Sequence, residues 1–315
     1  MIKKWSSRLT FFAFVVLMVG LGSNDSLRGI FSTIFQEHFS LTTTQLGLIV
    51  TASYIGNLVF LLVGGNLSTR FSKKRVLQVL ILIWMAALAL FAFTSNYTVL
   101  LIGMALALGS STLLNTTMNL ITPLLFATAP GFFVNFLFFT QEIGTSGSQY
   151  ILGSHADGFA FWQHTNLVLL ILGAVAFVLL LFCNVPEEAA APADAPAQKG
   201  GYDWRIIVPY VLVFGFYFIA EHGVMNWMVA YGVDGLGLPQ ASAAKYLSVF
   251  FGGMMIGRLC LSPLVDKLGA LKSLAAFGGV SCVLYLIGSL GGAVTMPVWA
   301  ISGLSFSILY PTLVM

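Results

Sequence analysis

Long apolar stretches recur along most of the chain, and short polar segments separate them. A helix that crosses a bilayer needs about 20 mostly apolar residues. The pattern therefore predicts an all-α polytopic membrane protein. The ten predicted spans are Leu9–Phe35, Gln45–Leu67, Val76–Thr94, Val99–Phe126, Phe132–Gly153, Asn166–Val185, Ile206–Val233, Tyr246–Val265, Leu271–Leu290 and Met296–Met315.

The first predicted span contains charged residues at membrane depth. Its apolar part, Leu9–Gly22, has 14 residues and is too short to cross. Crossing requires the helix to continue through Asn24, Asp25 and Arg28. The basic residues at the N-terminus resemble the start of a signal peptide. No small-x-small cleavage site follows them, so we expect a retained first helix.

One internal segment differs from the rest of the chain. Residues 186–203 are rich in proline, alanine and acidic side chains, and such a composition cannot bury itself in a core. We interpret this segment as a central loop. It divides the chain into a six-helix bundle at 1–185 and a second bundle at 204–315 with at least four helices.

The basic residues are distributed unevenly between the predicted loops. If the N-terminus lies inside, the inside segments hold 11 of the 14 Lys and Arg residues, and the outside loops hold only Lys245. Cytoplasmic loops of membrane proteins collect Lys and Arg. We therefore expect a multi-pass protein of the cell inner membrane whose N-terminus and central loop are cytoplasmic.

The composition agrees with a membrane protein and excludes other classes. The chain is 58% hydrophobic and 8% charged, whereas soluble domains carry about 25% charged residues. Cys183, Cys260 and Cys282 fall in apolar runs without metal-binding spacing. The sequence has no HExxH, nucleophile elbow or P-loop. We expect no enzymatic activity, no cofactor or metal, no nucleic-acid partner and no direct use of ATP.

Two loops share one template, and they begin 197 residues apart. Each has a small residue, then an acidic or polar residue, a basic residue, a second small residue and further basic residues. The first copy contains Gly65, Thr69, Arg70, Ser72, Lys73 and Lys74, and the second contains Ser262, Asp266, Lys267, Gly269 and Lys272.

These loops resemble the GxxxDRxGRR motif of the major facilitator superfamily. The first copy has Thr69 where the family prefers aspartate, and the second keeps Asp266 and Gly269. The resemblance implies a major facilitator fold with two six-helix bundles related about the membrane normal. A second repeat of this length would end near residue 395, roughly two spans later, so we expect two spans beyond Met315.

A narrower resemblance is to the fucose/glucose-galactose proton-symporter group. Within the seventh span, residues Tyr217–Tyr231 resemble the YxGAE…Y pattern of that group, with Ile219 in place of the glycine, and include Glu221. Asn24 and Asp25 resemble its membrane Asn-Asp pair. The fourth span is similar to its LETxxN stretch, with Asn115 where the group has a membrane glutamate.

Three acids at membrane depth are candidates for proton coupling, namely Asp25, Glu142 and Glu221. A charge inside a bilayer costs at least about 2.5–3.5 kcal/mol and therefore needs a reason. A desolvated carboxylate can bind and release a proton as a transport cavity alternates. Asp25 is the preferred proton carrier, and Glu142 is expected to assist it.

Each acid also has a structural alternative. Asp25 can pair with Arg28 one helical turn later. Glu142 can form an interhelical hydrogen bond, because Gly144 and Gly147 allow a neighbouring helix to approach. Glu221 can lie solvated near the outer mouth.

Amide and aromatic side chains complete the candidate site. Amides pair with solute hydroxyls, and Trp or Tyr rings cover the apolar face of a sugar. Asn115 and Asn119 share one helix face because they are four residues apart. The alternative is that these groups only join helices or lie at the lipid interface. The predicted solute-binding residues are Asn24, Asn115, Asn119, Gln141, Asn226, Trp227 and Tyr231.

The other charged and motif residues are predicted to serve gating, structure or topology. Arg258 is expected to snorkel inward or to pair with Asp266, and a lipid-headgroup contact is an alternative for the basic loop. This set consists of Arg28, Gly65, Arg70, Lys73, Lys74, Arg258, Asp266 and Gly269.

The sequence as a whole predicts a secondary active transporter. We expect proton symport of a sugar or similar small polar solute, by a monomer in the lipid bilayer. Export or uniport of another small solute is the alternative within transport. A truncated, non-transporting remnant is the alternative outside it.

Overall fold

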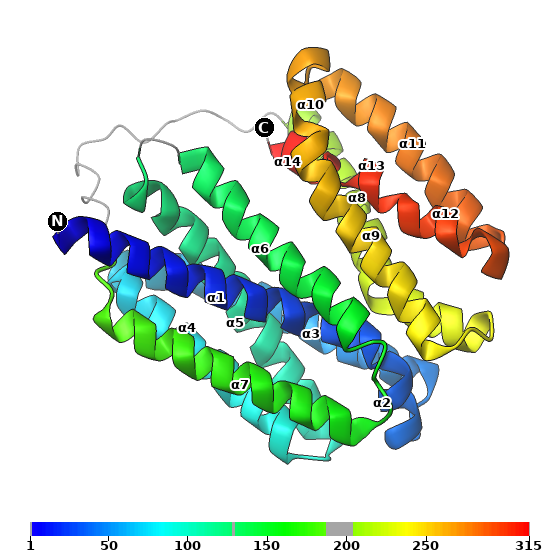
Figure 1. Cartoon of the computed structure of the whole chain (residues 1–315), viewed down its shortest axis with the longest axis horizontal. Coiled ribbons are helices and arrows are strands. Elements are labelled where there is room, and N and C mark those ends of the chain that lie inside the picture. Colours follow the sequence, from blue (N-terminus) through cyan, green and yellow to red (C-terminus); the bar gives the residue numbers. More distant parts are fainter. Residues whose placement is uncertain (1, 128–129, 187–203, 315) are drawn as a thin grey trace. The chain divides into compact units, whose positions relative to one another are not determined.

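The computed structural model describes residues 2–127, 130–186 and 204–314 (Figure 1). Some side chains within helices, including 2–6, 65–70 and 266, lie outside the described part. The described residues are helical and contain no strand. The chain divides into two compact units, Met1–Glu187 and Glu188–Met315.

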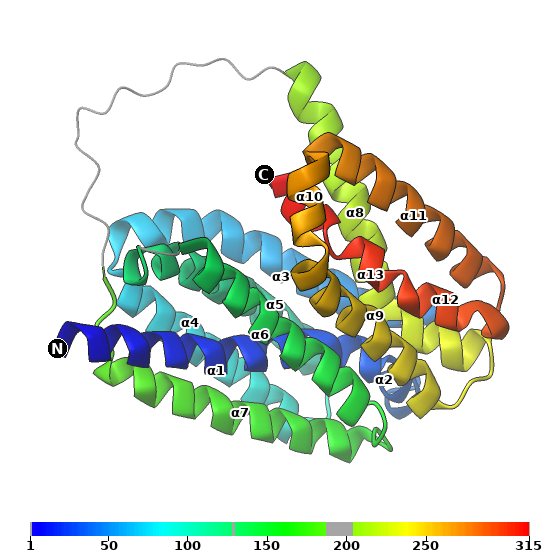
Figure 2. The same ribbon diagram turned by 45° about the horizontal axis from the view of Figure 1, so that its top comes forward.

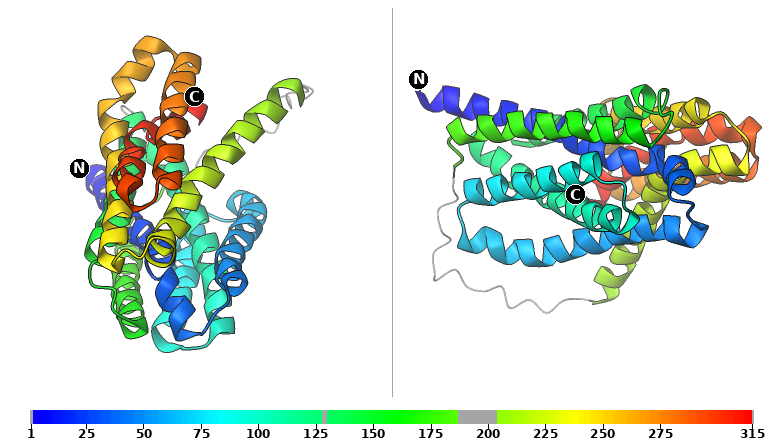
Figure 3. Two further views of the ribbon diagram at one scale, coloured as in Figure 1. Left: turned by 90° about the vertical axis from the view of Figure 1, so that its right-hand side faces the viewer. Right: turned by 90° about the horizontal axis from the view of Figure 1, so that it is seen from below.

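The first unit is built from seven helices. They are α1 (Ile2–Ile30), α2 (Ser32–His38), α3 (Thr43–Arg70), α4 (Lys73–Phe93), α5 (Tyr97–Leu125), α6 (Pro130–Ile151) and α7 (Phe159–Phe182). In this unit α1 packs against α5, α6 and α7, and α3 packs against α5 (Figure 2). Figure 3 shows these helices lying side by side along much of their length.

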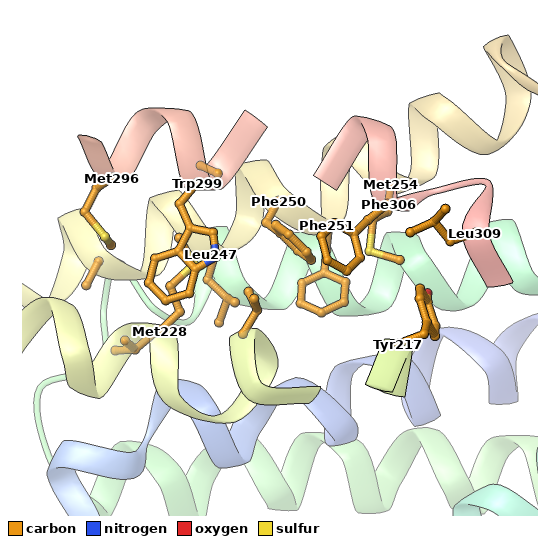
Figure 4. Packing of buried hydrophobic residues seen from close by; sticks show 14 of the residues in the cluster. Tyr217, Met228, Leu247, Phe250, Phe251, Met254, Met296, Trp299, Phe306 and Leu309 are labelled. Carbon is orange, nitrogen blue, oxygen red and sulfur yellow. The ribbon is translucent and has the colours of Figure 1, made fainter. Parts of the chain in front are cut away.

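The second unit contains longer helices and several short ones. They are α8 (Trp204–Ala230), η1 (Tyr231–Gly235), α9 (Gln240–Cys260), α10 (Ser262–Leu268), α11 (Ala270–Leu290), η2 (Ala293–Thr295), α12 (Met296–Ile301), α13 (Gly303–Phe306) and α14 (Leu309–Val314). Aromatic and methionine side chains from α8, α9 and α12 to α14 form its core (Figure 4).

The predicted all-α membrane architecture is confirmed, with corrections to the helix boundaries. Seven helices of the described part are long and apolar enough to cross a membrane. The first predicted span is divided at Phe31 into α1 and α2, and the sixth begins seven residues earlier than predicted, at Phe159. The apolar pattern missed that first turn because polar Gln163 and His164 follow it.

Serine side chains explain why the tenth predicted span is divided into three short helices. The Ser302 hydroxyl donates to the carbonyl of Trp299 at 2.6 Å, and the Ser307 hydroxyl donates to that of Leu304 at 2.7 Å. Such hydrogen bonds from a side chain to the preceding turn compete with the helical ladder and bend a helix. The three short helices are separated at Ser302 and at residues 307–308.

The contact between α1 and α6 depends on one of the two glycines predicted to allow it. A Cβ atom added to Gly144 would overlap the carbonyl oxygen of Val19 and lie 2.9 Å from its carbon. A Cβ atom at Gly147 would meet no atom of the described residues within 4 Å. The prediction of a close approach is therefore right for Gly144 and wrong for Gly147.

Candidate functional site

Three helices of the first unit hold seven of the predicted site residues. Asn24, Asp25 and Arg28 lie on α1, Asn115 and Asn119 lie on α5, and Gln141 and Glu142 lie on α6. Since α1 packs on both α5 and α6, and α5 also packs on α6, these residues share one region of the unit.

Three amides form a hydrogen-bonded chain, which we call the amide triad: Asn119, Asn115 and Gln141. The Asn119 Nδ2 donates to Asn115 Oδ1 at 2.6 Å, and the Asn115 Nδ2 donates to Gln141 Oε1 at 2.7 Å. The Asn119 Oδ1 atom is buried and has no hydrogen-bond partner among the residues that the structure describes. The triad therefore has an open acceptor that matches a solute hydroxyl.

Asp25 contacts Ser111, a residue that was not among the predicted site residues. The Ser111 hydroxyl on α5 donates to Asp25 Oδ1 at 3.4 Å, and the Ser111 side chain is almost fully buried. Ser111 is four residues before Asn115, so both occupy one face of α5. This spacing was the available signal, but a serine in an apolar span is common and the signal is weak alone.

The neighbours of Asp25 on α1 are buried within the first unit. Asn24 is 5% exposed and Arg28 is 4% exposed. The Arg28 guanidinium lies 6.0 Å from the centre of the Tyr54 ring, which belongs to α3. At that distance the ring face attracts the cation weakly.

Glu142 is buried beside the close contact between α1 and α6. The neighbouring Thr145 hydroxyl contacts the carbonyl of Gly22 at 3.2 Å, and the Ser23 hydroxyl contacts that of Gly144 at 3.3 Å. These bonds fix the relative positions of the two helices and hence of Gln141 and Asp25.

In the second unit, Glu221 belongs to the buried side of α8. It is 9% exposed, so the alternative of a solvated acid near the outer mouth is wrong. Arg258 on the adjacent α9 and Tyr217, one turn earlier on α8, lie near its carboxylate. The ring of Tyr310 on α14 is 6.2 Å from that of Tyr217. These residues form a cluster of two opposite charges and two tyrosines.

Three further residues on or just after α8 were predicted to bind solute. Asn226 is buried, and its Nδ2 donates to the carbonyl of His222 at 2.7 Å. The Tyr231 hydroxyl donates to the carbonyl of Ser289 at 2.9 Å, and its ring packs edge-on against Trp299. Trp227, four residues before Tyr231, is partly buried. Tyr231 thus packs within its own unit, at the end of the helix.

The loop motifs are described in part. The Lys74 ammonium donates to the carbonyls of Leu181 at 3.0 Å and Cys183 at 2.7 Å, so it caps the end of α7. Lys73 is partly buried at the start of α4. Gly269 has a φ of 80°, a backbone region that favours glycine.

Three motif predictions fall outside the described side chains. They concern Gly65, Arg70 and Asp266, including the predicted contact between Arg258 and Asp266.

Comparisons with known proteins bear on this fold. The chain is 24% identical to the L-fucose-proton symporter of Escherichia coli (strain K12), over 92% of this chain and 75% of that protein. It is 24% identical to the cis,cis-muconate transport protein of Acinetobacter baylyi, over 87% of this chain and 70% of that protein.

A similar fold is known from a crystal structure. The transporter FucP in its outward conformation matches with a TM-score of 0.69 and 20% identity, over 98% of this chain and 84% of that chain. A family model described as "Major Facilitator Superfamily" matches residues 10–315. The chain belongs to the major facilitator superfamily.

Proposed function

We propose that this chain is a secondary active transporter that carries a sugar or similar small polar solute across the inner membrane by proton symport. The observation that carries the proposal is the amide triad with its open acceptor at Asn119. An uncharged polyol offers hydroxyls that both donate and accept, and amides provide both partners. The fucose-proton symporter is a relative with this kind of solute.

Asp25 is the proton carrier in this proposal, and Glu142 assists it. Asp25 is partly buried and contacts α5, the helix that holds two members of the triad. Asn115 cannot ionise, so it leaves Asp25 and Glu142 as the acids of this region. A proton drives transport only if its affinity differs between the conformational states.

Uptake into proteoliposomes tests the proposal. Radiolabelled L-fucose, D-galactose, D-glucose and cis,cis-muconate are supplied with and without an inward proton gradient. Gradient-driven accumulation that a protonophore abolishes is the expected result. Equilibration without accumulation indicates a uniporter, efflux against the gradient indicates an exporter, and no movement of any probe contradicts transport of these solutes.

The Asp25→Asn variant separates the proton role from a structural one. We expect it to lose accumulation and to keep solute exchange. Accumulation by Asp25→Asn at the wild-type level would identify Asp25 as a structural partner of Arg28. Glu142→Gln and Glu221→Gln then identify the acid that carries the proton.

A second candidate is transport of an organic anion. One observation favours it, because Arg28 places a guanidinium at membrane depth on α1. A guanidinium binds a carboxylate with matched geometry. Accumulation of cis,cis-muconate but not of the three sugars, lost in Arg28→Gln, would support this candidate over the first.

We also propose that residues 1–185 and 204–315 are two bundles joined by a cytoplasmic loop, in a monomer whose N-terminus is cytoplasmic. Cysteine labelling in intact cells tests the orientation, in a background without Cys183, Cys260 and Cys282. An impermeant maleimide is expected to label Ala156→Cys and not Ala195→Cys. The reverse labelling would overturn the orientation.

A further inference from the structure

One face of α5 contacts both the proposed proton carrier and the amide triad. Residues 111, 115 and 119 follow one another at intervals of four, so they lie along one side of the helix. Ser111 bonds Asp25 of α1, and Asn115 bonds Gln141 of α6. Asn119 bonds back to Asn115 on the same helix. A single rigid helix therefore joins the acid to the amides.

The Ser111 hydroxyl can respond to the protonation state of Asp25. A carboxylate only accepts hydrogen bonds, whereas a carboxylic acid has one O–H donor as well as an acceptor oxygen, so proton binding allows Asp25 to donate to the Ser111 hydroxyl. The oxygen atoms are 3.4 Å apart, longer than the usual distance of about 2.7–2.8 Å for such a bond. The contact therefore has room to tighten by about 0.6 Å in another state.

A movement at Ser111 reaches the triad because a helix is stiff along its axis. Asn115 lies one turn away, and its bonds of 2.6 and 2.7 Å leave little freedom to adjust. A shift of α5 by a few tenths of an ångström, or a slight rotation, changes how Asn119 presents its open acceptor to a solute. Packed interfaces tend to switch between discrete arrangements.

We infer that Ser111 couples proton binding at Asp25 to solute binding at the amide triad, through the face of α5 that they share. Ser111 is thus a positioning residue: it contacts the proposed proton carrier Asp25 and acts on solute binding only through α5. The inference rests on the proposed proton symport and specifies how its two sites communicate.

α1 and other helices of the first unit carry further titratable groups. The Arg28 guanidinium on α1 is 6.0 Å from the centre of the Tyr54 ring on α3, Glu142 is buried on α6, and His164 is exposed on α7. α5 has one titratable side chain, that of Tyr97 at its far end. Among the groups that α5 presents to Asp25, the hydroxyl of Ser111 is the one with a hydrogen bond to the carboxylate. This makes its removal a specific perturbation of the link.

The chain contains a matched control at the adjacent position. Ser110 is fully buried, and its hydroxyl donates to the carbonyls of Leu106 and Ala107 within α5. Ser110→Ala removes a buried hydroxyl from the same turn without touching Asp25. Ser111→Thr keeps the hydroxyl and is the conservative rescue of Ser111→Ala.

Equilibrium binding at pH 6 and pH 8 tests the inference. The purified full chain is assayed with each radiolabelled probe of the uptake panel. Coupling energies between two sites usually correspond to about 5–150-fold changes in affinity. For wild type we expect at least about a fivefold change in Kd between the two pH values. For Ser111→Ala we expect less than about a twofold change, with Ser110→Ala and Ser111→Thr like wild type.

The outcomes distinguish a failure of the proposed symport from a failure of the role assigned to Ser111. If wild type binds none of the probes with a pH dependence, the proposed symport fails and this inference fails with it. If wild type is pH-dependent and Ser111→Ala is equally so, the inference alone is overturned. A Ser110→Ala variant that loses the pH dependence as fully as Ser111→Ala would also overturn it, since the effect would then belong to the turn and not to the contact with Asp25.

Discussion

The closest test of the packing in the first unit compares two glycines on one helix. Gly144 and Gly147 are three residues apart on α6, and both are candidates for substitution by alanine. The Cβ of Gly144→Ala would overlap the Val19 carbonyl, whereas that of Gly147→Ala would meet open space. Helix propensity changes equally in the two variants, so their difference isolates the contact between α1 and α6.

The size of the effect follows from the geometry. The new Cβ would lie 2.9 Å from the Val19 carbon, whereas ordinary contacts begin at 3.4 Å, so the helices must part by at least 0.5 Å. Overpacking of this kind costs about 1–3 kcal/mol. Parting also weakens the hydrogen bonds of Ser23 and Thr145 across the interface, each worth about 0.5–1.5 kcal/mol. The higher helix propensity of alanine offsets about 1 kcal/mol of this loss in stability.

We therefore expect Gly144→Ala to destabilise the chain by about 2 kcal/mol and Gly147→Ala to stabilise it by about 0.5–1 kcal/mol. The difference corresponds to roughly 6–12 °C in the thermal midpoint. Intrinsic tryptophan fluorescence during heating in detergent measures it. Equal midpoints for the two variants would refute the described contact between α1 and α6.

The remaining predictions concern polar groups in both units. Lys74→Met should lose about 1 kcal/mol of stability, measured by thermal unfolding, because the end of α7 loses its cap. Glu221→Gln and Arg258→Gln should each cost about 3 kcal/mol, because each leaves an opposite charge behind in the second unit, and the double variant should cost less than either; additive losses would argue against an interaction between these two charges. Asn115→Leu should weaken solute binding at least about tenfold in equilibrium dialysis, because Asn119 and Gln141 each lose their hydrogen bond to Asn115.

The sequence predicted the architecture well because hydrophobic length is a strong constraint in a bilayer. It also placed Asn115 and Asn119 on one face of their helix, and the structure joins them by a hydrogen bond. The spacing of four residues was sufficient for that prediction. It could not identify Gln141 as their partner, because this contact depends on how α5 and α6 pack.

Contacts between distant segments account for most of what the sequence did not reveal. Lys74 caps α7, more than a hundred residues later, and nothing local to the loop indicates that partner. Gly144 and Gly147 look equivalent in the sequence, yet only the first faces a neighbouring backbone. The burial of Glu221 likewise depends on α9 and α14, which the pattern along α8 does not specify.

The neutrality of the amide triad has an electrical consequence. A charge that moves across the membrane potential exchanges about 2.3 kcal/mol per 100 mV, whereas an uncharged amide exchanges nothing. The membrane potential therefore does not affect the free energy of reorienting Asn115, Asn119 and Gln141. Asp25 and Arg28 carry opposite formal charges, so while Asp25 is ionised their joint movement transfers no net charge across the membrane potential. In the proposed symport, a proton that neutralises Asp25 adds one positive charge to this region, and the membrane potential then acts on the protonated form.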